Sequence, residues 1–408
     1  MNDNNRDESA PEETESAPRP LKAWQQILIS VVLVLLVLFA GANVIIYTNY
    51  NNLGKLFQVV MNIHEHYVED VPFTELVDGA IGGMVKALDP YSSYQNAEES
   101  AEFMQELSGR IGGIGILISS ADPSKLVVVK VFSDSPAEKA ALLPGDIIIG
   151  ADGQNLTEME QDAAISLIRG EPGTDVALDI LRSEEGRTFQ VTLKREYIVV
   201  PSVEGGELPG RPGLALVAIS SFTEQTGDEF ARVLEEIDMP NKDGLILDLR
   251  YNSGGEVRAA LKTAGFLVPG REIFYVVDRD GAEKAEVSDS PYMDKPLVVL
   301  VNGYSASAAE IVAGAVKDYG SGKLVGSKTY GKGVMQTVYQ VDGSNLVLTT
   351  NRYLTPGRHD IHGSGIEPDV VVDLAAGEIV TIMPETETFD SQLREAERVL
   401  LELTEARG

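Results

Sequence analysis

The chain has 408 residues and a hydrophobic content of 43%, which is enough for two or three domains with buried cores. Its formal net charge of −30 gives an acidic surface that repels nucleic acids and anionic lipid head groups, so we expect no nucleic-acid partner. The chain contains no cysteine, which excludes disulfides and thiolate metal sites.

The N-terminal part predicts a tail followed by a membrane anchor. Residues 1–23 are polar and acidic and contain several prolines, which is typical of disorder. Residues 27–47 are almost all apolar, and at 1.5 Å per residue they span roughly 30 Å of hydrocarbon, so we expect a transmembrane helix within 24–48. Arg19 and Lys22 precede it, which predicts a cytoplasmic tail and a body on the periplasmic or extracellular side of the cell membrane.

A cleavable signal peptide is the alternative interpretation of the same segment. Ala40-Gly41-Ala42 has the A-x-A form of a cleavage site. Apolar residues continue beyond this box to Tyr47, and the preceding tail is long and acidic. The uncleaved anchor is therefore the favoured interpretation.

Residues 49–107 predict amphipathic helices. Apolar side chains recur there at helical spacing in two groups, Phe57, Val60, Met61, Ile63 and Tyr67, then Leu76, Ala80, Met84 and Leu88. The second group runs into the stretch Ala87-Leu88-Asp89-Pro90-Tyr91-Ser92-Ser93-Tyr94.

The next segment, residues 108–195, is predicted to contain strands bounded by glycine and proline, with one short helix around 160–168. It carries the cluster Gly112-Gly113-Ile114-Gly115-Ile116 and, later, Ser135-Pro136-Ala137-Glu138-Lys139-Ala140 and Leu143-Pro144-Gly145-Asp146-Ile147-Ile148. This order resembles a PDZ domain, in which loop amides bind a terminal carboxylate while an extended peptide adds to a sheet edge. The resemblance implies peptide binding by Gly113, Ile114, Gly115 and Ile116. Taken singly, the glycines indicate a tight turn and the isoleucines a core.

From residue 213 onward, strands and helices alternate, which predicts an α/β layer. Strands are expected at 214–219 and 244–249, with an amphipathic helix at 226–237 between them. The second strand runs into the loop Asp248-Leu249-Arg250-Tyr251-Asn252-Ser253-Gly254-Gly255. Further on, 345–352 predicts a strand and 389–405 a final amphipathic helix.

Residues 297–336 contain the candidate catalytic groups. The aliphatic run 297–301 predicts a buried strand, and from Ala306 small and apolar residues recur at helical spacing until Gly320. Serines therefore lie on a strand-to-helix turn, where free main-chain N–H groups can hold an oxyanion.

A serine nucleophile needs a base, and the four histidines lie in no context that suggests a triad. Lys332 is the better candidate because Gly331 and Gly333 on either side allow close approach of the backbone. A lysine base requires desolvation, and the following apolar residues are consistent with that. Gln336 is four residues away and can orient the amine. In isolation, Ser307 with Glu310 matches a helix-capping pattern, and a lone loop lysine is usually solvated.

Taken together, these motifs resemble the carboxyl-terminal processing, or tail-specific, serine protease family, whose pattern is S-A-S-A-x-E-I followed by x-G-K-G-x-x-Q. The resemblance implies that Ser307 is the nucleophile, Lys332 the general base and Gln336 its support. Asp318 matches an acidic position that is important in some members. Asp89 and its neighbours match a further family signature, L-D-P-x-S-x-Y.

The resemblance also implies an oxyanion hole. The loop ending in Gly254 and Gly255 matches the family element D-L-R-x-N-P-G-G, and either glycine is a candidate donor together with the amide of Ala308. This chain departs from the element at Ser253, where proline is usual. A serine in place of this proline affects the rigidity of the loop more than it affects the amide donors of the two glycines. The alternative role of the glycine pair is to form a simple turn.

The implied fold is an α/β protease core with crotonase- and Clp-protease-like layers, an inserted β-rich PDZ domain, an N-terminal helical segment and one transmembrane helix. The predicted domains are the tail 1–23, the anchor 24–48, the helical region 49–107, the PDZ domain 108–195, the protease core 196–375 and a C-terminal helical segment 376–408.

The implied function is a membrane-anchored serine endopeptidase that recognises protein substrates by their C-terminal tails and is gated by the PDZ domain. It needs no cofactor and no metal, and His359 with His362 in a loop lacks a third metal ligand. A homo-oligomer or an activating adaptor remains open as a further partner. The alternative function is a catalytically inactive, membrane-tethered PDZ scaffold that binds peptides.

Overall fold

A computed structural model of the chain describes residues 32–34, 36–37, 54–119, 125–375 and 378–407. The described residues divide between two units, one that ends at residue 80 and one that begins at residue 81. Most of the predicted membrane segment 27–47 lies outside the described residues. Within the described ranges, no helix has both the length and the apolar character needed to cross a bilayer.

Helices occupy the segment after the predicted anchor, as expected from its amphipathic spacing. Residues 54–66 are helical, and α2 follows at Phe73–Lys86. Leu88, which was expected in the second helix, lies beyond the end of α2. A short strand, β1 (Ser93–Gln95), and a third helix, α3 (Ala97–Ser108), complete this part of the chain.

The predicted α/β layer is a six-stranded sheet in the order β10-β11-β12-β15-β16-β19. The strand β10 pairs antiparallel with β11, and every later pair in the sheet is parallel. The bounds are β10 Val203–Leu208, β11 Arg211–Ile219, β12 Gly244–Asp248, β15 Leu297–Val301, β16 Lys323–Gly326 and β19 Val370–Val371.

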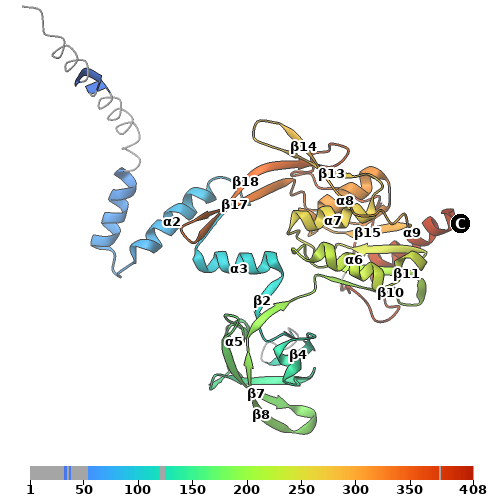
Figure 1. Ribbon diagram of the computed structural model, residues 1–408, viewed down its shortest axis with the longest axis horizontal. Helices are drawn as coiled ribbons and strands as arrows, with labels where there is room; N and C mark the ends of the chain where they lie inside the picture. The colour runs from blue at the N-terminus through green and yellow to red at the C-terminus, as the bar shows by residue number, and fades with distance from the viewer. Residues whose placement is uncertain (1–31, 35, 38–53, 120–124, 376–377, 408) are drawn as a thin grey trace, which may run out of the picture. The chain divides into compact units, whose positions relative to one another are not determined.

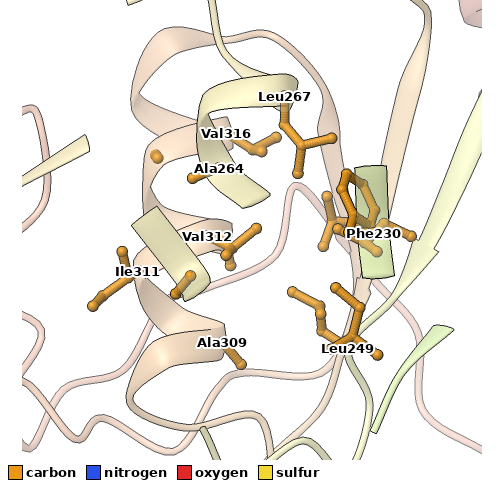
Figure 2. Close-up of a cluster of buried hydrophobic side chains, with 14 of the residues drawn as sticks. Phe230, Leu249, Ala264, Leu267, Ala309, Ile311, Val312 and Val316 are labelled. Atoms are coloured by element: carbon orange, nitrogen blue, oxygen red, sulfur yellow. The ribbon is translucent and has the colours of Figure 1, made fainter. Parts of the chain in front are cut away.

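Both faces of this sheet are buried, which explains why its central strands are continuously apolar. Alternate residues such as Leu247 and Val299 belong to one core, with α6 (Thr226–Glu236), α7 (Val257–Leu267) and α8 (Ala308–Tyr319). Figure 1 shows α7 and α8 beside β13 and β15. Figure 2 shows Phe230, Leu267 and Val312 pointing toward one another in this core.

The opposite face of the sheet packs against the C-terminal helix α9 (Ser391–Arg407). Residues of the strands that point away from the first core, such as Ile246 and Val298, form a second core with Leu393 and Leu400 of this helix. The predicted final helix is thus confirmed, and it packs on the sheet of the same chain.

A second sheet has the order β1-β18-β13-β14, with β17 paired to β18. Its remaining bounds are β13 Glu272–Val277, β14 Glu283–Val287, β17 Val334–Val341 and β18 Ser344–Leu354. Ser93 of β1 lies opposite Val347 of β18, so pairing fixes the Asp89–Tyr94 stretch to the same sheet as the segment that follows Lys332.

The predicted β-rich module has a hydrophobic core of its own, which includes Val128, Ile148, Ile168 and Leu178. One sheet has the order β3-β4-β5-β7-β8, with β6 on β5, and β2 pairs separately with β9. The strands are β2 Arg110–Gly113, β3 Ile116–Ile118, β4 Leu126–Val131, β5 Asp146–Ala151, β6 Gln154–Asn155, β7 Asp175–Arg182, β8 Arg187–Lys194 and β9 Glu196–Val199. The helices are α4 Pro136–Lys139 and α5 Gln161–Ile168, the latter at the predicted position.

Replacement of Leu400 by alanine tests the contribution of α9 to the protein's stability. The Leu400 side chain is fully buried, so we expect Leu400→Ala to lower the free energy of unfolding by about 2–5 kcal/mol through lost burial and a new cavity. The control is Glu405→Ala, an exposed position of the same helix, for which we expect a change within about 0.5 kcal/mol. Urea unfolding followed by circular dichroism measures both, and equal midpoints for the two variants would show that α9 is dispensable.

Candidate active site

The two serines of the turn between β15 and α8, Ser305 and Ser307, have different surroundings. Ser305 is fully buried, and its hydroxyl donates to the Leu249 carbonyl at 2.8 Å while it accepts from the Asn302 amide at 2.9 Å. Ser307 is only partly buried and faces a cleft of about 640 Å³. Ser305 is therefore committed to the structure of the turn, and Ser307 is available for chemistry.

Ser307 has φ 53° and ψ −115°, a conformation that non-glycine residues rarely adopt. Such strain persists only where the surroundings enforce it, and it is common at nucleophiles on sharp strand-to-helix turns. The phenol of Tyr353 helps to hold this residue, because it donates to the Ser307 carbonyl at 3.1 Å. Burial raises the pKa of Tyr353 well above its ordinary value of 10, so the donor proton stays in place.

The buried carboxylate of Glu310 joins the serine turn to the lysine loop. Its Oε2 atom accepts from the amides of Ser307 at 2.9 Å and Lys332 at 2.8 Å. Its Oε1 atom accepts from the Gly331 amide at 2.7 Å and from the Thr329 hydroxyl at 2.6 Å. The side chain is 0% exposed, and hydrogen bonds to a charged acceptor are short and strong, so this carboxylate holds the backbones of Ser307 and Lys332 together.

Lys332 lines the same cleft as Ser307, which we call the Ser307 cleft; its wall also includes Tyr91, Gln336, Gly255 and Val334. Desolvation by burial lowers the pKa of Lys332 below its ordinary value of 10.5, although the nearby carboxylates of Asp89 and Glu310 oppose that shift. Among the described residues, no hydrogen bond joins Nζ to Ser307 or to any other side chain. The amine is thus partly desolvated and free to approach a reacting group.

The two glycines beside Lys332 allow close approach of the backbone, as expected, and the segment that approaches is another loop of the chain. Gly331 has φ 90°, and a Cβ added there would lie 2.7 Å from the Gly365 amide nitrogen. A Cβ added at Gly333 would lie 2.8 Å from the His362 amide nitrogen. Both glycines therefore let the lysine loop pack against the segment 361–365.

Gln336 contacts a network instead of the amine. Its Nε2 donates to the Thr349 hydroxyl at 3.2 Å, and that hydroxyl donates to Asp89 Oδ1 at 3.2 Å. Within the described part of the chain, the expected hydrogen bond from Gln336 to the Lys332 amine is not formed. The structure therefore connects Gln336 to the Asp89 motif, through a neighbouring strand.

The candidate oxyanion donors are not equivalent. The Gly254 amide already donates to the Asn252 side chain at 2.9 Å, whereas the Gly255 and Ala308 amides have no acceptor among the described residues. Gly254 instead packs against Ser307, because a Cβ added at Gly254 would lie 2.7 Å from the Ser307 Cβ. Gly255 and Ala308 are thus the better pair of donors, and Ser253, the departure from the family element, is exposed at the cleft.

Asp318 lies apart from the residues that line the Ser307 cleft. Its carboxylate accepts from the Gly357 amide at 2.7 Å and pairs with His359 Nδ1 at 3.1 Å. These contacts attach the end of α8 to the turn after β18. Its observed partners are therefore structural.

The four predicted peptide-binding residues of the β-rich module come together in one groove. Gly113, Ile114, Gly115 and Ile116 line it with side chains from α5 and its end, namely Ile165, Ile168 and Arg169. Gly115 has φ 83°, and a Cβ there would lie 2.2 Å from Ser135, so only glycine fits this turn. The groove lies between β3 and α5 and is largely apolar.

Sequence reasoning missed three contributors to the site. Glu310 was considered only as a helix cap, and Tyr353 was not considered. Tyr91, whose ring centroid lies 5.1 Å from Lys332 Nζ, was noted only as part of a motif. The S-x-x-E spacing marks Glu310, and the L-D-P stretch marks the neighbourhood of Tyr91. Neither pattern reveals which distant loop these two side chains contact.

Family models match three segments of the chain. The model described as peptidase family S41 matches residues 213–372, and a PDZ domain model matches 112–193. The model described as the activating protease CtpB N-terminal domain matches 41–99. The chain thus combines an S41 peptidase segment with a PDZ domain of the predicted type.

Relatives match over most of the chain. A "Probable CtpA-like serine protease" of Staphylococcus aureus strain COL is 35% identical over 398 residues, covering 93% of this chain and 78% of that protein. A solved structure described as an S41 protease from Bacteroides fragilis covers 85% of this chain and 97% of its own, with a TM-score of 0.50 and 16% identity, and supports the fold alone. The photosystem II D1 C-terminal processing protease is 28% identical, covers 84% of this chain and 90% of its own, and has a TM-score of 0.48.

Replacement of Glu310 by glutamine tests the carboxylate that joins the two loops. The variant keeps the shape of the side chain but turns an NH₂ group toward N–H donors. We expect the rate at which Ser307 reacts with a fluorophosphonate to fall about 10- to 100-fold, since each lost hydrogen bond to a charge is worth about 1.5–3 kcal/mol. Glu367→Gln, at an exposed carboxylate, is the control and should react like the parent. If Glu310→Gln reacts at the parental rate, the negative charge of Glu310 is not needed to hold the Ser307 and Lys332 loops in place.

Proposed function

This chain belongs to peptidase family S41 and is a serine peptidase, and from that premise we propose that Ser307 and Lys332 form its catalytic dyad. The observation that carries the proposal is their position in one cleft, with both loops tied to the same buried carboxylate. The lowered pKa of Lys332 supports the role of a base, because only the neutral amine can accept a proton.

The proposed reaction needs no group beyond these residues and water. Ser307 Oγ attacks the peptide carbonyl carbon while Lys332 Nζ takes the hydroxyl proton, and the amides of Gly255 and Ala308 hold the oxyanion. The ammonium then gives this proton to the leaving nitrogen as the C–N bond breaks. A water molecule next attacks the acyl-serine, and its proton returns to Ser307 Oγ through the same amine.

We propose further that substrates are recognised through their C-terminal tails by the PDZ groove and that docking there gates the cleft. The apolar lining of the groove suits an apolar terminal side chain, and the strand β3 suits addition of an extended peptide. The relatives described as CtpA-like serine proteases support a peptide substrate. A catalytically inactive scaffold, the alternative function, gives no reason for a partly desolvated lysine in the same cleft as a strained serine.

Cleavage of an unfolded protein with an apolar tail tests the dyad and the groove together. We expect Ser307→Ala and Lys332→Ala each to lower kcat by about a thousandfold or more, since neither nucleophile nor base can be replaced by water. Lys328→Ala, at an exposed lysine of the same loop, is the control and should retain the parental rate. Gel-based initial rates measure all of these.

The tail requirement is measured in the same assay. Ile165→Glu places a charge in the groove, and it should remove the preference for an apolar tail over one that ends in two aspartates while leaving Ser307 reactive to a fluorophosphonate. Equal cleavage by the parent, Ser307→Ala and Lys332→Ala would end the dyad proposal. Unchanged tail preference in Ile165→Glu would end the groove proposal alone.

We also propose that residues 24–48 anchor the protein in the cell membrane with the catalytic body on the extracytoplasmic side. The support is the apolar composition of the segment and the basic residues before it. Membrane fractions washed with alkaline carbonate should retain the full-length chain. Protease added outside spheroplasts should digest the body but spare the tail. Release by carbonate, or a mature N-terminus just after Ala42, would contradict the anchor.

A further inference from the structure

We propose that Tyr91 is a positioning residue for the catalytic base, an inference that rests on the proposed Ser307–Lys332 dyad. The Tyr91 ring lines the Ser307 cleft, and the Lys332 Nζ lies 5.1 Å from its centroid. Among the described residues, the Lys332 amine makes no hydrogen bond and no ion pair. Its contact with the Tyr91 ring is therefore the specific side-chain interaction found for it there. The stretch before the PDZ domain thereby becomes part of the catalytic machinery.

The backbone of Tyr91 is held firmly by the acidic residue before it. Asp89 Oδ1 accepts from the amides of Tyr91 and Ser92, each at 2.8 Å, and Asp89 Oδ2 accepts from the Ser92 hydroxyl at 2.8 Å. The Thr349 amide of β18 donates to that hydroxyl at 3.1 Å. Tyr91 is therefore attached to the sheet that contains β17, the strand that follows Lys332.

The ring itself is held from two further sides. Its edge contacts His362, with ring centroids 6.0 Å apart and planes at 64°. Its hydroxyl is influenced by Tyr330, which lies two residues before Lys332. Burial, followed by the influence of Tyr330, raises the pKa of Tyr91 above its ordinary value of 10, so the phenol is neutral in the working range. The ring is thus a fixed, uncharged surface beside the amine.

This surface has two physical effects on the amine. It attracts the ammonium form through the quadrupole of the ring, which favours one position of Nζ in the cleft. It also displaces water from that side of the amine, and water solvates an ammonium better than a ring face does, so the displacement favours the neutral base. Removal of the ring should therefore loosen the amine and raise its pKa.

Other ionisable groups around the amine set the background for this effect. Asp89 and Glu310 act on Lys332 directly and favour its charged form. His362 contacts the Tyr91 ring, Tyr330 acts on the Tyr91 phenol, and Tyr353 lines the same cleft as Ser307. Charged residues of α7 and β14 also line the cleft, namely Arg258 on α7, Glu256 at its start, and Lys284 and Glu286 on β14. All of these groups remain in the Tyr91 variants below, so a change in the pH profile can be attributed to removal of the Tyr91 ring.

The test is the pH profile of fluorophosphonate reaction at Ser307 in the full-length protein, with peptide mapping of the adduct. We expect Tyr91→Ala to react about tenfold more slowly at pH 7.5 and to show a midpoint at higher pH than the parent. Tyr91→Phe keeps the ring and should stay within threefold of the parent with the same midpoint. If circular dichroism shows that Tyr91→Ala is unfolded, Tyr91→Leu replaces it, and a tenfold lower plateau rate is expected.

The outcomes separate this inference from the dyad itself. A parental midpoint and plateau in Tyr91→Ala, or a Tyr91→Phe variant as slow as Tyr91→Ala, would overturn the role of the ring while leaving the dyad intact. A parent that forms no adduct at Ser307, or a Lys332→Ala variant that reacts as fast as the parent, would overturn the dyad first. A merely structural tyrosine would lower the amount of active protein without moving the midpoint.

Discussion

The structure of the site depends on one buried carboxylate. Glu310 accepts hydrogen bonds from the main chain of both Ser307 and Lys332, which are 25 positions apart in sequence and belong to different loops. A buried charge is costly unless it is fully hydrogen-bonded, and here four donors satisfy it. Because the carboxylate cannot be solvated, the two loops must stay together around it. The proposed nucleophile and the proposed base are thus positioned through their backbones.

Under the proposed dyad, this arrangement explains how Lys332 can act as the base in place of a histidine. The backbone of Lys332 is fixed, but its amine is left without a hydrogen-bonding partner among the described residues, so burial is the main influence on its pKa. The Tyr91 ring provides contact without hydrogen bonds, and the strained Ser307 turn presents its hydroxyl to the same cleft. Rigid loops and a partly desolvated amine are the combination that base catalysis by lysine requires.

Much of this could be predicted from the sequence, because the informative patterns were local. The aliphatic run 297–301, the helical spacing up to Gly320 and the glycine cluster of the PDZ domain each encode one element, and each is found where expected. Gln336 and Gly254 were assigned by motif, and their hydrogen-bond partners proved to be Thr349 and Asn252. Such partners come from other loops or strands, and no periodicity within one segment encodes them.

The most direct test of Lys332 as the base is the titration of its own amine, followed by NMR of ¹³Cε-labelled lysine and assigned with a Lys332→Met variant. The structure predicts a midpoint below the ordinary lysine value of 10.5, shared with the pH profile of Ser307 acylation. A midpoint at or above 10.5, with acylation that follows some other group, would contradict the assignment of Lys332 as the base.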